Sequence, residues 1–430
     1  MNPPLNIAIA GLGTVGAATV RLIQSHGPLL AARAGREVAI VAVSARDRDR
    51  DRGIDLARIE WEDDALALAT RPGIDAVVEL IGGADGTARD LVEAALAAGR
   101  HVITANKALI AHHGTALARL AEDKGVSLRY EAAVAGGIPI VKALREGLAA
   151  NSVERVYGIL NGTCNYILTT MRESGREFDD VLAEAQALGY AEADPGFDID
   201  GVDTAHKLAI LTALAFGCEI DFDAVHIEGI RDVTADDIRF AEELGYRIKL
   251  LGIARKTADG IRQRVHPSLV ARDAPIASVE DVFNAVVADG DFVETTLYEG
   301  RGAGGGPTAS AVVADIMDVA RDDRIPTFAI PAAQLAPSRP APLERRVGAF
   351  YICMTVRDEP GVMADITAVF RDERISLESM LQRGRSPGEP VPVVLTTHET
   401  EEAAMVRALA RIAGLETMIA PPRMIRIETL

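Results

Sequence analysis

The chain has 430 residues, 48% of them hydrophobic and 25% charged, which is the composition of a soluble globular protein with room for about three domains. Its formal net charge of −18 argues against broad contact with nucleic acid or with an anionic membrane, because both bind clustered cations. The cysteines Cys164, Cys218 and Cys353 are too far apart for a disulfide framework or a zinc site, and without a leader segment or a membrane-length apolar run we expect a cytoplasmic protein.

The first predicted unit is a strand, a glycine-rich turn and a helix. Residues 6–10 form an apolar strand, glycines follow with the spacing of a dinucleotide fingerprint, and residues 17–24 continue with helical apolar spacing. The first glycine makes the turn, the second lets the backbone approach a pyrophosphate, and the third lets helix and strand pack closely. The alternative is a tight turn in another kind of α/β protein. The expected cofactor-binding residues of this turn are Gly11, Gly13, Thr14, Val15 and Gly16.

A second predicted strand, residues 37–43, ends at Ser44, and Arg46 follows two residues later. A site specific for NAD places an acidic residue at this strand end to bind the ribose 2′-hydroxyl, whereas a serine and an arginine can bind the 2′-phosphate of NADP. The sequence therefore favours NADP, and NAD stays possible. Arg46 can alternatively belong to a solvated run of charges that continues to Arg52.

Two later predicted strands, residues 76–81 and 101–104, lead toward Lys107. A lysine just beyond the carboxyl end of a parallel strand lies where open α/β sheets bind ligands. Lys107 is therefore a candidate active-site lysine, although a single lysine in this position is more often solvated.

Residues 131–139 form an apolar loop with two adjacent glycines and a proline. Glycines free the backbone to turn its carbonyls inward, and such carbonyls are ligands for a hard cation. A tight connection between two domains is the alternative interpretation.

The most informative polar motif is residues 192–207, where acidic side chains surround a Pro-Gly turn that opens a helix. Residues 208–216 continue that helix, so Asp203 and Lys207 stand four positions apart on one face, within reach of each other. The ordinary interpretation is a solvated salt bridge that contributes about 0–1 kcal/mol. Carboxylates that converge on a lysine beside a buried helix, however, shift pKa values and suit acid/base chemistry.

A second region begins near residue 151 and continues with strands to about residue 299. Residues 300–307 are a glycine-rich loop that opens a helix over residues 308–321, whose first amide groups can contact the cofactor. The prolines of residues 326–342 predict a semi-rigid linker.

The C-terminal region predicts a βαββαβ order. Its elements are expected at residues 349–356 (strand), 363–371 (helix), 375–382 and 391–397 (strands), from Glu401 (helix) and at residues 418–427 (strand). The order resembles an ACT domain, a ligand-sensing module common on enzymes of amino-acid pathways. An oligomerisation domain without a ligand is the alternative.

The motifs together resemble those of the homoserine dehydrogenase family. The stretch from Ala185 to Lys207 follows the family signature closely, with Gly-Tyr, Glu, Asp-Pro, Asp, Gly, Asp and Lys in order. Five further motifs occur in the family's order, at residues 11–16, 104–107, 131–139, 161–166 and 302–308.

The resemblance implies an α/β fold with three domains. It implies a Rossmann-like nucleotide-binding domain at residues 1–150, an α+β substrate and dimerisation domain at 151–325, a linker at 326–345 and a C-terminal ferredoxin-like ACT domain at 346–430. The chain is expected to return to the nucleotide domain near residues 305–330. Assembly into a homodimer or homotetramer is also implied.

The implied reaction is the reversible, NAD(P)H-dependent reduction of L-aspartate 4-semialdehyde to L-homoserine, on the route to threonine, methionine and isoleucine. The catalytic residues implied are Lys207, Lys107 and Asp203, the substrate-binding residues Glu192, Asp198, Asp203 and Lys207, and the further cofactor-binding residues Ser44, Arg46, Lys107 and Gly302. A monovalent cation, Na⁺ or K⁺, is implied at Glu131, Val134, Gly136 and Ile138. Threonine is the implied inhibitor of the enzyme. It would bind the ACT domain at the turn of residues 358–362, near Ser379 and Gln382.

Two other functions stay open at the level of the sequence. A semialdehyde dehydrogenase would use Cys164 as its nucleophile, although no base is evident near it in the sequence. A non-catalytic regulator would bind NADPH and an ACT ligand without turnover.

Overall fold

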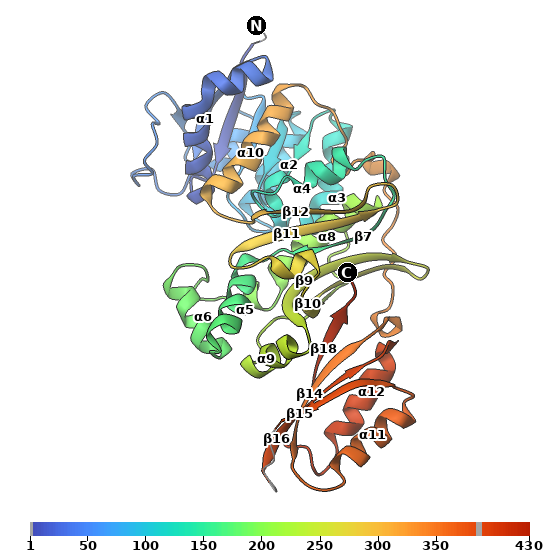
Figure 1. Ribbon diagram of the computed structural model, residues 1–430. Coiled ribbons are helices and arrows are strands. Elements are labelled where there is room, and N and C mark those ends of the chain that lie inside the picture. Colours follow the sequence, from blue (N-terminus) through green and yellow to red (C-terminus); the bar gives the residue numbers. More distant parts are fainter. Residues whose placement is uncertain (1–2, 384–388) are drawn as a thin grey trace.

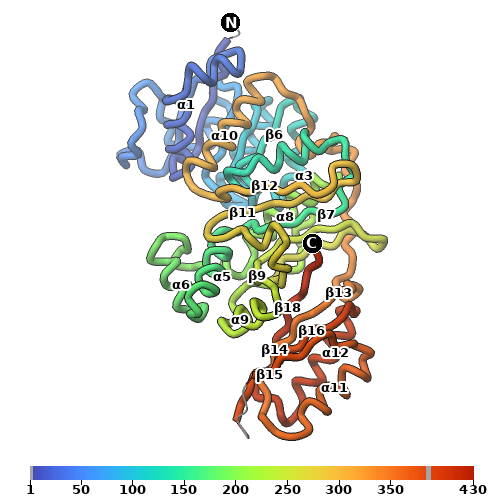
Figure 2. The backbone as a smooth tube through the Cα atoms, in the orientation of Figure 1, coloured from blue at the N-terminus to red at the C-terminus, as the bar shows by residue number. Residues whose placement is uncertain are grey.

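The computed structural model describes residues 3–383 and 389–430 and arranges them in three stacked parts (Figure 1). The N-terminal part lies at the top of the view, a second part in the middle and the C-terminal part at the bottom. The end of the chain turns back from the bottom part and lies in the middle part (Figure 2).

The top part is built on a parallel sheet with the strand order β3-β2-β1-β4-β5-β6. Its strands are β1 (Leu5–Ala10), β2 (Val38–Ser44), β3 (Glu60–Trp61), β4 (Ala76–Glu79), β5 (His101–Thr104) and β6 (Leu128–Arg129). The order reverses beside β1, which lies between β2 and β4. Open α/β sheets bind their ligands at such a point, outside the carboxyl ends of the strands.

Helices cover both faces of this sheet, and alternate residues of β1 pack against each. Ile7 and Ile9 belong to the core under α1 and α10, whereas Ala8 and Ala10 belong to the core on the opposite face. The helices are α1 (Thr14–Ala34), α2 (Thr87–Ala97), α3 (Lys107–Asp123) and α10 (Gly305–Ala320). Helix α10, drawn in orange, lies beside the blue α1 although the two are far apart in the sequence (Figure 1).

The middle part is a mixed sheet with helices packed against it. Its strands are β7 (Val153–Ile159), β8 (Val225–Ile227), β9 (Tyr246–Thr257), β10 (Gly260–Ala271), β11 (Phe283–Gly290) and β12 (Glu294–Arg301). Its helices are α5 (Gly162–Ser174), α6 (Phe178–Ala187), α7 (Gly196–Ile199), α8 (Val202–Phe216) and α9 (Ala235–Glu243). The short helix α4 (Ile140–Lys142) lies higher, at the level of α3 in the top part (Figure 1). Helix α8 is apolar on most sides and buried, because it packs on β7 and β9 and also against α3 of the top part.

The bottom part confirms the predicted βαββαβ order. Its elements are β14 (Phe350–Arg357), α11 (Val362–Asp372), β15 (Leu377–Gln382), β16 (Pro390–Thr397), α12 (Glu402–Ala413) and β18 (Arg423–Glu428), with a small pair of strands β13 (Val347–Gly348) and β17 (Thr400–Glu401). The strand order β18-β14-β16-β15 is antiparallel throughout. The two helices lie together beside this sheet, as in a ferredoxin-like fold (Figure 1).

The sheets of the middle and bottom parts are one continuous sheet. Strand β18 pairs in parallel with β10, and Ser268 lies opposite Arg426. The segment expected to be a linker also lies against the middle part, since Ala336 bridges to Cys218 and Pro340 bridges to Ile261. The bottom part is therefore joined to the middle one by backbone hydrogen bonds as well as by side chains.

Candidate active site

The candidate active site lies where α3 of the top part meets α8 of the middle part. Lys107 is the first residue of α3 and stands three residues after Thr104, the carboxyl end of β5. The Asn106 side chain caps this helix by accepting a hydrogen bond from the Leu109 amide at 3.1 Å. On the other side, Gly201 has a left-handed backbone with φ of 86°, and this conformation lets α8 begin at Val202.

The Asp203 carboxylate bridges two lysines. One oxygen lies 2.8 Å from Lys107 Nζ, and the other accepts a hydrogen bond from Lys207 Nζ at 2.7 Å. Lys207 Nζ also donates to the Leu160 carbonyl at 2.7 Å. Asp203 and Lys207 are both buried, whereas the Lys107 side chain is about one-third exposed, at 34%. The structure thus brings together the three residues that the motifs implied as catalytic.

Burial and mutual charge separate the pKa values of these three groups. Burial raises the pKa of Asp203, but Lys207 and Lys107 lower it by more, so this carboxyl stays ionised. Burial lowers the pKa of Lys207; Asp203 opposes this change and Lys107 adds to it, and the net pKa lies below the ordinary value. Burial also lowers the pKa of Lys107, but Asp203 and neighbouring carboxylates outweigh it and raise the net pKa. Lys207 is therefore the lysine that releases its proton more easily.

A second carboxylate, Asp198, is held at the same site from α7. Asn161 Nδ2 donates at 2.8 Å both to Asp198 and to Asp203, so one amide ties the two carboxylates together. The Thr163 hydroxyl lies 3.3 Å from the other Asp198 oxygen. Burial and the charge of Asp203 raise the pKa of Asp198. These hydrogen bonds fix the orientation of Asp198 toward the lysines.

Glu192 is less closely attached than the motifs suggested. Its side chain is exposed, and its carboxylate makes no hydrogen bond or ion pair with any residue that the structure describes. It still lies near enough to raise the pKa of Lys107 through its charge. Asn161 and Thr163, by contrast, belong to a motif that the sequence singled out without giving them a role.

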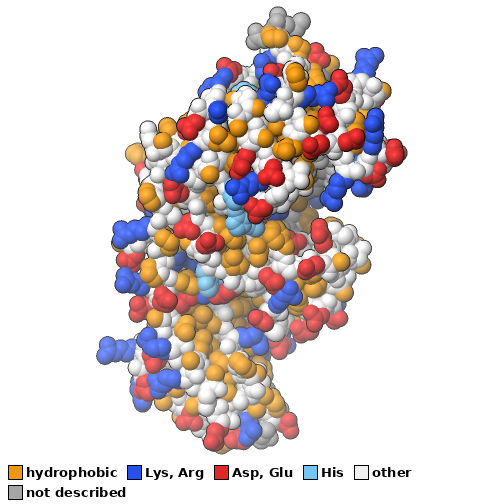
Figure 3. All heavy atoms as spheres, turned by 180° about the vertical axis from the view of Figure 1, so that it is seen from behind, with side chains coloured by type: hydrophobic (Ala, Val, Ile, Leu, Met, Phe, Trp, Pro, Cys, Tyr) orange, Lys and Arg blue, Asp and Glu red, His pale blue; other side chains and the backbone are white. Residues whose placement is uncertain are grey.

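Two histidines adjoin the lysines. His206 precedes Lys207 on α8, and its Nε2 lies 3.2 Å from Nε2 of His112 on α3. The His206 ring stacks on Phe222 with centroids 4.5 Å apart. Burial and the neighbouring His112 lower the pKa of His206 to about 4, so this ring is neutral near pH 7. Figure 3 shows histidine side chains gathered near the level where the top and middle parts meet.

The glycine-rich turn fits a dinucleotide. Gly11 has φ of 95°, and a side chain there would clash with the Leu80 carbonyl. A Cβ at Gly16 would collide with Gly11, whereas a Cβ built on Gly13 would have no described atom within 4 Å apart from its chain neighbours. Open space above the second glycine is what a pyrophosphate needs to approach the backbone. The first amides of α1, including those of Thr14 and Val15, face this turn without a side-chain cap from the described residues.

The residues expected near the 2′-position of the cofactor ribose lie at the end of β2. Ser44 is buried and its carbonyl accepts a hydrogen bond from the Gly11 amide at 2.8 Å, while Arg46 is exposed. Arg52, which the sequence assigned to a solvated run, donates from Nε to the Leu12 carbonyl at 3.1 Å and lies over Trp61. Its place beside the glycine turn depends on tertiary structure, so spacing could not reveal it.

The glycine loop expected to bind a cation contacts the second glycine-rich loop. The Gly137 amide donates to the Arg301 carbonyl at 2.9 Å, and a Cβ on Gly136 would meet the Gly302 carbonyl at 2.6 Å. Ala135 and Gly136 both have positive φ angles, which turn the local carbonyl groups out of line with one another. The structure therefore places Gly302 directly beside this loop.

The chemistry of this loop suits a hard cation. Both Glu131 carboxylate oxygens accept amide hydrogens, from Val141 at 3.0 Å and Lys142 at 2.8 Å. Burial and the nearby Asp315 raise the pKa of Glu131 to about 8. A bound cation would favour the ionised form of this buried carboxyl. The ligands that the family resemblance implied for such a cation are Glu131, Val134, Gly136 and Ile138.

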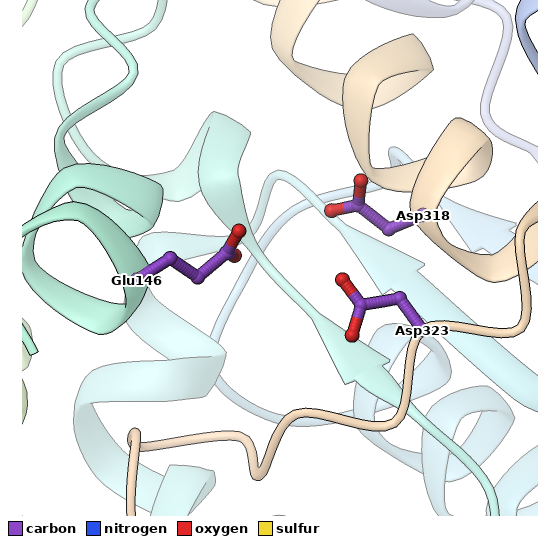
Figure 4. A group of neighbouring side chains, drawn as sticks. All are labelled: Glu146, Asp318 and Asp323. Carbon is purple, nitrogen blue, oxygen red and sulfur yellow. The ribbon is translucent and has the colours of Figure 1, made fainter.

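Three other carboxylates, Glu146, Asp318 and Asp323, face one another nearby (Figure 4). Cationic side chains already balance them: Lys142 pairs with Asp318, and Arg145 lies 2.6 Å from Glu146. This group is therefore a local ion-pair network, and we assign it no ligand.

Comparison with known proteins agrees with the geometry. Family models described as homoserine dehydrogenase, as its NAD binding domain and as the ACT domain match residues 139–317, 11–131 and 351–414. The chain is 45% identical over 433 residues to the homoserine dehydrogenase of Neisseria gonorrhoeae and 45% identical over 434 residues to that of Pseudomonas aeruginosa, and each alignment covers 99% of both chains. A homoserine dehydrogenase structure from Thiobacillus denitrificans matches with a TM-score of 0.94 and 47% identity, over 99% of this chain and 98% of that chain.

The fold and the site define an oxidoreductase that acts on a CH–OH group with a nicotinamide cofactor. The candidate active site lies between the nucleotide domain and a second domain. The chain belongs to the homoserine dehydrogenase family and carries an ACT domain, which confirms the resemblance drawn from the motifs. In the two described ranges, all helices are too short or too polar to cross a membrane.

Proposed function

We propose that the homoserine dehydrogenase reaction of this chain takes place at the two lysines that Asp203 bridges. That bridge is the observation that carries the proposal. It holds two lysine amino groups together at the carboxyl edge of the parallel sheet of the domain that also contains the glycine-rich turn. The substrate pair is L-aspartate 4-semialdehyde and L-homoserine. Bound nicotinamide cofactor supplies or accepts the hydride.

Each residue then has a distinct task. Lys207 donates a proton to the aldehyde oxygen during reduction and takes it back during oxidation, because its pKa is the lower of the two lysines. Lys107, which is more exposed, stabilises the same oxygen by its charge. Asp198, with Glu192 at the rim, offers carboxylates to the substrate ammonium.

The environment of Cys164 argues against a thiolate mechanism. Its side chain is completely buried, its Sγ lies 3.3 Å from the Asp198 carbonyl, and burial raises its pKa well above the usual range. A nucleophilic thiolate needs the opposite shift. We therefore expect the Cys164→Ser variant to keep its activity.

The direct test is an assay of NADPH oxidation with aspartate semialdehyde. Turnover that depends on both compounds and yields homoserine supports the proposal. If the purified chain binds NADPH but turns nothing over, it is a regulator, and the catalytic proposal is wrong.

The two directions of the reaction are expected to respond oppositely to pH. Homoserine oxidation needs neutral Lys207 and rises with pH, whereas aldehyde reduction needs the protonated form and falls. Because burial lowers the pKa of Lys207, the midpoint is expected below about pH 10.4, the ordinary value for lysine. Initial rates in both directions across roughly pH 6–10 measure this difference. Identical profiles would contradict a lysine acid and base.

We propose NADP as the preferred cofactor, with NAD as a weaker substrate. Arg46 is exposed two residues after the buried Ser44, where its guanidinium can reach a 2′-phosphate. The Arg46→Ala variant is expected to raise the KM for NADPH by about tenfold, the effect of losing a charged contact, and to leave the KM for NADH nearly unchanged. Arg58→Ala serves as an exposed control. An equal rise for both cofactors would mean that Arg46 belongs to the solvated run of charges and does not bind the 2′-phosphate.

We propose that Na⁺ or K⁺ binds at the loop of residues 131–138. Support comes from the buried carboxyl of Glu131 and from the positive φ angles of Ala135 and Gly136.

We also infer that the chain forms a homodimer or homotetramer. Edge strand β12 carries the partly exposed Leu297 and follows Phe292, whose side chain is exposed, and exposed apolar side chains at a sheet edge favour contact with another subunit.

Threonine is the proposed effector of the ACT domain. Gly361, with φ of 104°, opens α11 after the turn at residues 358–360, and the amides at this helix N-terminus can bind an amino-acid carboxylate. Ser379 lies 2.7 Å from Thr396 on the paired strand, and Gln382 is exposed. We expect threonine to inhibit the full chain and the Gly361→Asp variant to be less sensitive, as measured by inhibition curves. If the full chain ignores threonine, the domain has another ligand or none.

A further inference from the structure

The junction between the bottom and middle parts contains a buried guanidinium with two carboxylate partners. Arg426 on β18 is 2% exposed. Its two terminal nitrogens donate to the Glu228 carboxylate at 2.7 and 2.9 Å, and its Nε donates to Glu402 at 3.1 Å. Glu402 begins α12 of the bottom part, whereas Glu228 follows β8 of the middle part. Arg426 thus connects the two parts through a bidentate ion pair.

The backbone after Glu228 is packed against the turn between α7 and α8. Gly229 lies so close that a Cβ there would come within 2.6 Å of Asp200 Cα. The next amide, that of Ile230, donates to the Ile199 carbonyl at 2.9 Å. The side chains of Ile199 and Ile230 are both fully buried. A shift of Glu228 therefore cannot be absorbed by loose packing at this point.

This turn carries the substrate side of the active site. Asp198 is the last residue but one of α7, and its carbonyl accepts a hydrogen bond from the Gly201 amide at 3.0 Å. Gly201 caps α8, whose first turn holds Asp203. The residues between Glu228 and Asp198 are in direct contact at every step, without an intervening flexible segment.

We propose that Arg426 and Glu228 are positioning residues for substrate binding: their ion pair holds residues 228–230 against the α7–α8 turn and thereby sets the position of the Asp198 carboxylate. The C-terminal domain contributes in this way to substrate affinity without reaching the active site itself. The inference rests on the proposed role of Asp198 in binding the substrate ammonium.

The surroundings of Glu228 allow a substitution there that disturbs the fold little. Its side chain is 39% exposed, and His226 Nε2 lies 2.6 Å from one oxygen. In a Glu228→Gln variant, Arg426 keeps its partner Glu402, so no buried charge is left alone. Replacing Arg426 by an apolar residue would instead remove the hydrogen-bonded cation of the buried Glu402. Glu228→Gln is therefore the variant of choice.

The experiment compares steady-state kinetics of full-length variants for homoserine oxidation. Glu228→Gln is expected to raise the KM for homoserine by about fivefold or more, the low end of typical couplings between sites, with kcat and the KM for the nucleotide within about twofold. Glu280→Gln is the matched control, because Arg172 holds Glu280 by two 2.8 Å contacts in the same domain but away from this turn. It is expected to leave the KM for homoserine unchanged.

Two further variants decide the interpretation. Arg426→Lys keeps the charge but loses the bidentate contact, and it is expected to raise the same KM; it also replaces Glu228→Gln if that variant does not fold. Asp198→Asn tests the underlying assignment by the same KM. If Asp198→Asn raises the KM while Glu228→Gln and Arg426→Lys match the control, the positioning role is wrong. If Asp198→Asn also leaves the KM unchanged, the proposed substrate role of Asp198 is overturned, and this inference with it.

Discussion

Replacing Lys207 by alanine is expected to lower kcat by about 100-fold or more, the usual contribution of a general acid or base. Lys207 is buried, bridged to Asp203 at 2.7 Å, and has the lower pKa of the two lysines. The glycine turn proposed to bind the nucleotide lies in the other domain, so NADPH affinity is expected to change little. Stopped-flow or steady-state turnover, together with NADPH fluorescence titration, separates the two effects.

Lys256→Ala is a suitable control for this substitution. Lys256 is an exposed lysine of the same domain, and its Nζ lies 5.7 Å from the centre of the Phe216 ring. The control is expected to keep its turnover. Normal turnover in Lys207→Ala would mean that Lys107 or water, and not Lys207, transfers the proton.

Replacing Asp203 by asparagine is expected to lower kcat by about 100-fold, the effect of misplacing a reacting group by about 1 Å. The carboxylate holds both lysines, and the neutral amide loses both ion pairs while keeping the size of the side chain. Asp203 also raises the pKa of Lys207, so its loss is expected to lower that pKa further. The residual oxidation activity is then expected to have its midpoint at a lower pH than in the parent.

The comparison for this variant is Asp200→Asn. Asp200 lies three residues earlier, in the turn before α8, but its side chain is 46% exposed and pairs with Arg231 at the surface. Its kcat and pH profile are expected to match the parent. An Asp203→Asn variant with reduced kcat but an unchanged pH midpoint would mean that Asp203 does not tune Lys207.

Local patterns predicted the elements better than their ends. The strand and glycine turn at residues 6–16 were recognised because apolar spacing and glycine positions are local properties. Helix α1, expected at residues 17–24, in fact spans Thr14–Ala34, because Gly13 opens it earlier and it continues through Pro28 to Gly35. Only tertiary packing on α10 could reveal that extension.

The same limit applies to the active site. Asp203 and Lys207 were predicted as a pair because they are four apart on one helix. Their contact with Lys107 was implied only by the family resemblance, and the double hydrogen bond of Asn161 was missed because its partners lie 37 and 42 residues away. No spacing rule covers contacts made between separate elements of a fold.

The sheet shared by β10 and β18 has a consequence for cutting the chain. The match to the ACT model ends at residue 414, so β18 lies outside it. A polypeptide shortened there, or before residue 346, would leave residues 268–270 of β10 as an open edge, and open edges recruit strands from other molecules. It would also leave the buried Arg264 without Glu428, its partner at 2.8 Å. Self-association, with loss of the cooperative melting of the middle domain, is thus the expected fate of such a fragment.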